Sequence, residues 1–251
     1  MDLGLADRVY LVTGGARGLG RATADVLVAE GARAVLSGRT EETLAAAVSQ
    51  LGDHASYVVG DNADPATPAR LVAAARDRWS RLDGALISVG GPPRGPVTAM
   101  SDEQWSTAFG SVFLGAVRVA REVAAELGEG GSIAFVLSTS VRAPLAEMAI
   151  SNGLRPGLAM VAKQLADELG PRGIRVNGLL PGRIRTERLA ELDAAAADPE
   201  AARAAGRRAI PLGRYGEPSE FGRAAAFLLS PAASFVSGAM LPVDGGLLRS
   251  L

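Results

Sequence analysis

The strongest constraint in the sequence is a glycine-rich turn, Thr13–Gly20, which reads TGGARGLG between an apolar strand and a helix. Gly14 permits a tight turn, Gly18 lets the backbone approach a ligand, and Gly20 lets the helix pack closely on the strand. The helix then begins with unpaired N–H groups and the positive end of its dipole, which together favour phosphate binding. We therefore expect the turn, including Leu19, to hold the pyrophosphate of a dinucleotide.

Strand and helix patterns alternate along the whole chain, which is typical of a parallel sheet covered by helices on both faces. Apolar runs predict about seven strands, near 9–13, 34–38, 56–59, 84–88, 132–138, 175–179 and 240–243. Helical patterns lie near 19–29, 41–50, 65–79, 102–127, 152–169 and 218–229, and Thr40 is a good N-cap for the second. We expect residues 1–251 to form one α/β domain, a Rossmann-type doubly wound parallel sheet.

One segment interrupts this alternation. Residues 185–211 are rich in alanine and charge, and their pattern is helical. Insertions at the carboxyl edge of such a sheet often act as lids. We interpret 185–211 as a substrate lid, with a plain surface helical hairpin as the alternative.

Composition excludes several kinds of site and partner. The 26 basic residues nearly balance the 27 acidic ones, so charge gives no reason to expect nucleic acid or a membrane surface as partner. Without cysteine there are no disulfides, thiolate nucleophiles or zinc-thiolate sites, and the one histidine, His54, lies among polar residues. No apolar run approaches the roughly 18 residues that span a bilayer. We expect a cytoplasmic protein with no metal site and a small-molecule substrate.

Two arginines lie where a phosphorylated ribose would be bound. NAD-binding sheets usually carry an acidic residue at the end of the second strand, where it holds the ribose hydroxyls. Here that position reads Ser37-Gly38-Arg39, and Arg17 lies in the first turn. Because a guanidinium matches a phosphate in a forked geometry, Arg17 and Arg39 favour NADP(H) over NAD(H). A solvated arginine at the start of a helix is the alternative for Arg39.

These motifs together resemble the short-chain dehydrogenase/reductase family over nearly the whole chain, and the C-terminal part resembles its 3-oxoacyl-[acyl-carrier-protein] reductase branch. The resemblance implies hydride transfer with a nicotinamide cofactor, and homotetramers or homodimers formed through the long helices and the last strand. The positions that it implies for cofactor contact, beyond the turn, are Asp61 and Asn62 for the adenine, Gly90 after the fourth strand, and Pro181, Gly182, Ile184 and Thr186 after Asn177.

The family's catalytic residues are mostly replaced. The family uses Asn, Ser, Tyr and Lys, with the last two spaced as YxxxK. By the resemblance, Ser138 occupies the serine position, whereas Val112, Ser151 and Arg155 occupy the other three. A serine hydroxyl is a far weaker acid than a phenol, whose pKa is about 10, so Ser151 is a poor proton donor near pH 7. Arg155 keeps the positive charge and the ability to bind the ribose, but it does not shuttle protons.

A divergent ketoreductase-like subgroup resembles the chain at both altered segments. It carries GGPP after the fourth strand and SNxxR in place of YxxxK, and this chain reads Gly90-Gly91-Pro92-Pro93 and Ser151-Asn152-Gly153-Leu154-Arg155. The resemblance implies an alternative catalytic site made of Ser138, Ser151 and Arg155. Loss of chemistry is the other interpretation. Glu147 is the nearest carboxylate in sequence and could relay a proton, although an exposed loop glutamate is the simpler interpretation.

Three functions remain open from the sequence. The first is an NADP(H)-dependent oxidoreductase acting on a carbonyl or alcohol with a non-standard active site. The second is a non-redox enzyme on the same scaffold, such as a dehydratase, isomerase or cyclase. The third is a catalytically silent NADP(H)-binding protein.

Overall fold

In the computed structural model, which describes residues 2–194 and 196–250, seven parallel strands form one sheet in the order β3-β2-β1-β4-β5-β6-β7. The order reverses between β1 and β4, the point beside which ligands bind in such sheets. This confirms the predicted Rossmann-type fold. The strands are β1 (Val9–Val12), β2 (Arg33–Gly38), β3 (Ala55–Val59), β4 (Gly84–Ile87), β5 (Ser132–Val136), β6 (Arg175–Pro181) and β7 (Met240–Val243).

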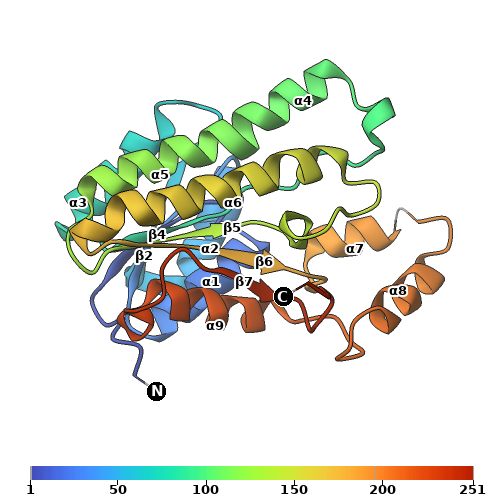
Figure 1. The fold of residues 1–251 in the computed structure, drawn as a ribbon. Coiled ribbons are helices and arrows are strands. Elements are labelled where there is room, and N and C mark those ends of the chain that lie inside the picture. The colour runs from blue at the N-terminus through green and yellow to red at the C-terminus, as the bar shows by residue number, and fades with distance from the viewer. Residues whose placement is uncertain (1, 195, 251) are drawn as a thin grey trace.

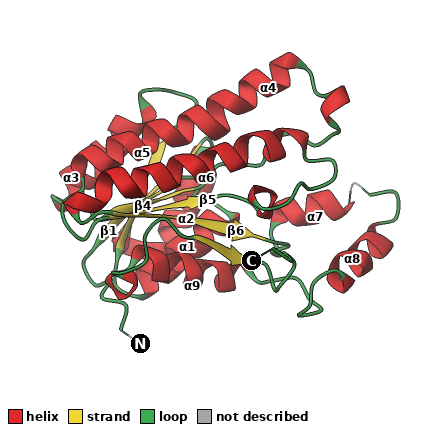
Figure 2. Ribbon diagram, in the orientation of Figure 1, coloured by secondary structure: helices red, strands yellow, loops and turns green. Residues whose placement is uncertain are grey.

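Helices cover both faces of the sheet and enclose a separate apolar core on each (Figures 1 and 2). One face carries α3 (Thr67–Trp79), α4 (Asp102–Ala108), α5 (Gly115–Glu126) and α6 (Ala149–Leu169), and the other carries α1 (Gly18–Ala29), α2 (Glu41–Leu51) and α9 (Pro218–Leu229). No helix within residues 2–194 and 196–250 is long and apolar enough to cross a membrane.

Two predicted helices differ from the structure near the candidate site. The helix predicted over 102–127 is broken by a π-helical segment, Phe109–Leu114, between α4 and α5. The helix predicted from residue 152 begins at Ala149, so Ser151 lies in its first turn. Thr40 is the N-cap residue of α2, but its hydroxyl caps no described backbone N–H.

The segment predicted to be a helical insertion forms two short helices, α7 (Glu187–Ala194) and α8 (Pro199–Arg208). They follow β6 and lie at the side of the sheet toward which β6 points (Figure 1). The Asp198 carboxylate accepts hydrogen bonds from the N–H groups of Glu200 and Ala201 at 3.1 and 2.9 Å, which starts α8.

Two arginines bind the carbonyl groups that helices leave unpaired at their C-terminal ends. The Arg175 guanidinium, on β6, donates to the carbonyls of Leu228, Leu229 and Ser230 at 2.7, 3.3 and 2.9 Å, at the end of α9. Arg172 donates to carbonyls at the end of α5. Each guanidinium satisfies orphan acceptors and lies at the negative end of a helix dipole; Arg175 is buried, whereas Arg172 is exposed.

We predict that Arg175→Met destabilises the protein by about 2–4 kcal/mol, because it removes the charged donor from the carbonyls at the end of α9 and leaves that of Leu228 without another described donor. Thermal unfolding should show a Tm lower by roughly 5–12 °C. The control is Arg33→Met, which breaks a partly exposed pair with Asp7 and should change Tm by no more than about 2 °C. Equal Tm values for the two variants would contradict the capping role.

Candidate active site

The glycine-rich turn has the geometry that a dinucleotide requires. Gly14 and Gly18 have positive φ values, 61° and 59°, which favour glycine. A Cβ on Gly20 would collide with the Gly14 carbonyl, whereas one on Gly18 would meet nothing among the described residues nearer than the Thr186 methyl group, at 3.9 Å. The outer surface of Gly18 is thus open for backbone to approach a phosphate.

Hydrogen bonds fix this turn against the ends of the neighbouring strands. The Thr13 hydroxyl donates to the Ser88 carbonyl at 2.6 Å and accepts from the Ser88 N–H at 2.8 Å. The Gly15 N–H donates to the Ser37 carbonyl at 3.0 Å. The turn therefore lies beside the carboxyl ends of both β2 and β4.

The start of α1 is suited to a phosphate group. Arg17 is its N-cap residue and offers no side-chain acceptor to the first N–H groups, and the first turn contains no acidic residue. These N–H groups and the helix dipole are left for an anion. The residues around Gly14, Gly18, Leu19 and Gly20 therefore fit a dinucleotide pyrophosphate.

The arginines predicted to bind a ribose phosphate lie in different surroundings. Arg39 is exposed directly after β2. Arg17 lies 3.4 Å from the Glu187 carboxylate at the start of α7, and both side chains are about 70% exposed. An exposed pair of this kind contributes little energy and is readily displaced by a phosphate.

The predicted adenine contacts follow β3. The Asp61 carboxylate accepts a hydrogen bond from the Ala63 N–H at 2.9 Å, which shapes the loop. The Asn62 carbonyl packs against Gly115, the first residue of α5, where a side chain would not fit. Both residues thus lie at the carboxyl edge of the sheet.

The segment after β6 runs back toward the glycine-rich turn. Gly182 packs against Asp244, and its N–H donates to the Val243 carbonyl at 3.0 Å. Ile184 is buried and pairs with Gly216, whereas the Thr186 hydroxyl accepts from the Leu189 N–H at 3.3 Å and starts α7. Asn177 instead has a structural role, because its side chain joins β6 to the segment before β7.

Ser138 lies just beyond β5 and is half-buried. Its hydroxyl oxygen accepts a hydrogen bond from the Ser140 N–H at 3.1 Å. Because an accepting hydroxyl keeps its own proton to donate, Ser138 can bind a carbonyl oxygen.

The Ser151-Asn152 pair holds the loop between β5 and α6. Ser151 is buried, and its hydroxyl oxygen is 3.4 Å from that of Ser140. The Asn152 side chain accepts from the Leu145 N–H at 3.1 Å and donates to the Leu145 carbonyl at 2.8 Å. Ser140 and the Asn152 clamp were missed from the sequence, because an i to i−7 contact depends on the loop path and leaves no periodic signal.

Arg155 is buried between the ends of two strands. Its guanidinium donates to the Val136 carbonyl at 2.6 Å and to the Val89 carbonyl at 3.4 Å, and its exposed fraction is 5%. Burial lowers the pKa of Arg155 to about 10. At pH 7 the guanidinium is charged in both the folded and the unfolded chain, so the cost of burying the charge is fully present there and is lost only as pH rises above 10.

The other candidate groups are occupied elsewhere. Val112 is a buried apolar residue within the π-helical segment, a feature that is common at functional sites. The Tyr10 hydroxyl donates to the Leu229 carbonyl, and the Tyr215 hydroxyl donates to the Asp193 carboxylate. Lys163 is exposed and lies against Gly238.

The loop after β4 pairs with the loop before α6. The Gly95 N–H donates to the Glu147 carbonyl at 2.9 Å, and the Ala149 N–H donates to the Gly95 carbonyl at 3.2 Å. Glu147 is exposed and has a φ of 58°, which is costly for a residue with a side chain. Gly90 lies at the start of this paired loop, exposed, and a Cβ there would meet none of the described residues within 4 Å.

A polar cluster that the sequence did not reveal fastens α7 and α8. The buried Asp193 carboxylate accepts from the Tyr215 hydroxyl at 3.2 Å and lies 3.5 Å from the Arg183 guanidinium. Gly206 of α8 packs on the same tyrosine, where a Cβ would be 2.5 Å from its hydroxyl.

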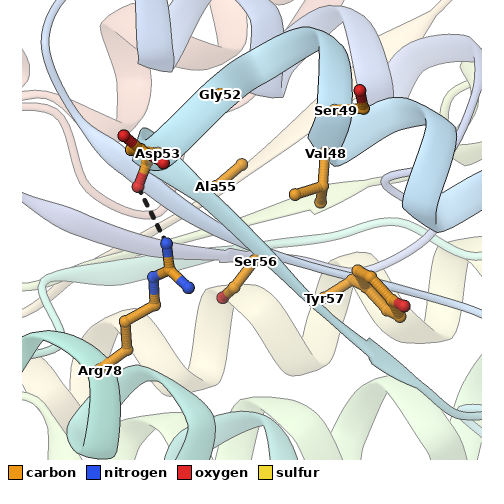
Figure 3. A pocket seen from close by; sticks show the side chains of 8 residues that line it. All are labelled: Val48, Ser49, Gly52, Asp53, Ala55, Ser56, Tyr57 and Arg78. Carbon is orange, nitrogen blue, oxygen red and sulfur yellow. Dashed lines mark hydrogen bonds between the residues drawn. The ribbon is translucent and has the colours of Figure 1, made fainter.

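The hollow drawn in Figure 3 is separate from the candidate active site. It is bordered by α2, the start of β3 and Arg78 of α3, and Arg78 donates to the Asp53 carbonyl at 3.3 Å. The catalytic candidates and the glycine-rich turn are absent from its lining. The site is therefore defined by the strand ends and not by this hollow.

Known proteins resemble the chain over almost its whole length. A family model described as enoyl-(acyl carrier protein) reductase matches residues 14–248. An A-factor type gamma-butyrolactone 1'-reductase of Streptomyces virginiae is 38% identical over 251 residues, which covers 96% of each chain.

Two solved structures share the fold. A short-chain dehydrogenase/reductase from Brucella melitensis has a TM-score of 0.93 at 29% identity, with 100% of both chains covered. L-Sorbose reductase from Gluconobacter frateurii, solved with NADPH and L-sorbose, has the same TM-score, identity and coverage. Sequence and fold agree: the chain belongs to the short-chain dehydrogenase/reductase family.

Proposed function

We propose that the protein is an NADP(H)-dependent reductase that interconverts a carbonyl and an alcohol at a site without the family's tyrosine and lysine. The half-buried Ser138 hydroxyl carries the proposal, because it keeps a proton to donate and lies at the same sheet edge as the glycine-rich turn. The butyrolactone reductase and the NADPH-bound sorbose reductase support a reductase.

The bound cofactor would supply hydride, and this chain's residues would hold and orient both partners. Arg39 and Arg17 would bind the 2′-phosphate after displacing Glu187, and Asp61 and Asn62 would contact the adenine. The turn residues Gly14, Gly18, Leu19 and Gly20 would bind the pyrophosphate, and Gly90, Pro181, Gly182, Ile184 and Thr186 would border the nicotinamide.

At the reacting carbon, Ser138 would donate a hydrogen bond to the substrate oxygen, and Arg155 would supply a fixed positive charge. Ser151 would act through Ser140, by holding the loop that carries Ser138. Water would deliver the proton, since the simple hydroxyls at this site are weak acids near pH 7.

Residues 185–211 would act as the lid. The Arg17–Glu187 pair and the approach of Thr186 to Gly18 join this segment to the glycine-rich turn, which supports closure over bound cofactor. The Arg183–Asp193–Tyr215 cluster would keep the two helices together as one unit.

We predict that Ser138→Ala lowers kcat/KM for ketone reduction by roughly 100-fold, because it removes the donor to the developing oxyanion. NADPH oxidation with a panel of ketones is the measurement. The control is Ser140→Ala, which keeps the backbone N–H that binds Ser138 and should lower kcat/KM only a few-fold. Product formation without nicotinamide turnover would indicate a non-redox enzyme instead.

We predict that Arg39→Asp weakens NADPH binding by roughly 10–100-fold, because a carboxylate would then face the 2′-phosphate, and that it strengthens NADH binding. Calorimetric titration with each cofactor measures both. Arg33→Ala, at the other end of β2, is the matched control and should leave NADPH affinity unchanged. An unchanged preference in Arg39→Asp would contradict the proposed phosphate site.

We also propose a homo-oligomer formed through the outer face of α5, α6 and the π-helical segment. Phe109 stacks on Phe113 and is 46% exposed, and Met160 is 70% exposed. We predict that Phe109→Glu with Met160→Glu yields smaller particles in light scattering after gel filtration, because charge at an apolar contact opposes association. A wild-type monomer would refute this.

A further inference from the structure

Among the described residues, the two buried arginines are Arg155 and Arg175, and their surroundings differ in one respect. Arg175 lies at the C-terminal end of α9, among four backbone carbonyls and at the negative end of a helix dipole. Arg155 has two carbonyl partners, one of them at 3.4 Å, and these lie at or just after the ends of strands, which have little net dipole. The fold therefore compensates the buried charge of Arg175 but not that of Arg155.

None of the described carboxylates forms an ion pair with Arg155. The ion pairs within residues 2–194 and 196–250 involve other arginines. Burial is the one cause that perturbs the pKa of Arg155, which indicates that no charged group acts on it strongly. Taking an unpaired charge out of water is costly, so its retention calls for a partner that the fold itself does not supply.

The Arg155 guanidinium also keeps a donor for such a partner. In the described part of the chain, the buried side-chain polar atom without a hydrogen-bond partner is Ser56 Oγ. The Arg155 Nε donates to none of the described groups, so it is not sealed within the protein. A donor that is neither bonded nor enclosed is open to a bound molecule.

The position of Arg155 places that molecule beside Ser138. The Arg155 guanidinium is bound to the Val136 carbonyl at the end of β5, and Ser138 lies two residues farther along the same segment, so the Cα atoms of residues 136 and 138 are about 7 Å apart. The cofactor phosphates are expected elsewhere, at the start of α1 after β1. The missing anion therefore belongs on the substrate.

We propose that the substrate is an oxo carboxylic acid whose carboxylate binds Arg155 and whose ketone oxygen binds Ser138. A carboxylate matches the planar donors of a guanidinium. Because both groups lie at the carboxyl end of β5, a short 2-oxo or 3-oxo acid would reach both. In these acids one or two bonds separate the carbons of the two functional groups.

The inference rests on the proposed reductase function. Hydride from NADPH forms the new C–H bond at the ketone carbon, the C=O π pair moves to oxygen, and that oxygen takes a proton from water. The products are the hydroxy acid and NADP⁺, and the carboxylate is unchanged.

The test compares each acid with its neutral methyl ester, using 2-oxobutanoate and acetoacetate. Wild-type enzyme should have a kcat/KM at least about 10–100-fold higher for one acid than for its ester, because a charged hydrogen bond is lost in the ester. In Arg155→Met the acid-to-ester ratio should fall to near one, whereas Arg155→Lys should keep most of it. Arg223→Gln, an exposed arginine of α9, should leave the ratio unchanged.

A binding measurement covers the case in which Arg155→Met is inactive. Oxamate and malonate are unreactive stand-ins for the 2-oxo and 3-oxo acids, and one of them should raise the Tm of the wild-type NADPH complex but not that of the Arg155→Met complex. Equal rates for acid and ester in the wild type, or a Tm shift that persists in Arg155→Met, would overturn the proposal. Failure of NADPH to bind in calorimetry would instead refute the reductase function.

Discussion

The paired hydrogen bonds between Thr13 and Ser88 are the interaction on which the candidate site depends. They join the ends of β1 and β4, the neighbouring strands between which the order of the sheet reverses. A Cβ on Gly14 would lie 3.1 Å from the Ser88 carbonyl oxygen, so a larger residue at position 14 would crowd the segment after β4. The same contact keeps the glycine-rich turn beside the segment that leads to Gly90, so cofactor and substrate positions are set together.

Arginine side chains donate many of the hydrogen bonds that hold this fold together. Lys163 is the single lysine, and it is exposed. Arg172 and Arg175 satisfy helix ends, which a lysine would do less well because it lacks the wide, planar set of donors. Arg155 uses the same planar geometry to reach carbonyls after two strands at once. Position 155 therefore holds a group that joins two strand ends and carries a charge.

Much of the fold could be predicted from the sequence, because strand and helix periods are local signals. The strand predictions agree with the structure to within about two residues, and the turn from Thr13 to Gly20 is predicted from its glycines together with the strand before it and the helix after it. The π-helical break at Phe109–Leu114 was missed because it does not disturb the apolar pattern on either side. The partners of Ser151 and Arg155 were also beyond prediction, since they depend on how a loop and two strand ends meet in space. The roles proposed for these residues remain predictions.

The contacts that hold the loop before α6 restrict the substitutions that the chain can accept. Asn152 holds Leu145, Ser151 contacts Ser140, and Arg155 spans two strand ends. A substitution at one of these positions breaks an existing contact of the loop or of the strand ends. Each such substitution would lower stability before a second change could compensate for it. Substitutions at the three positions are therefore expected to be accepted together and not one at a time.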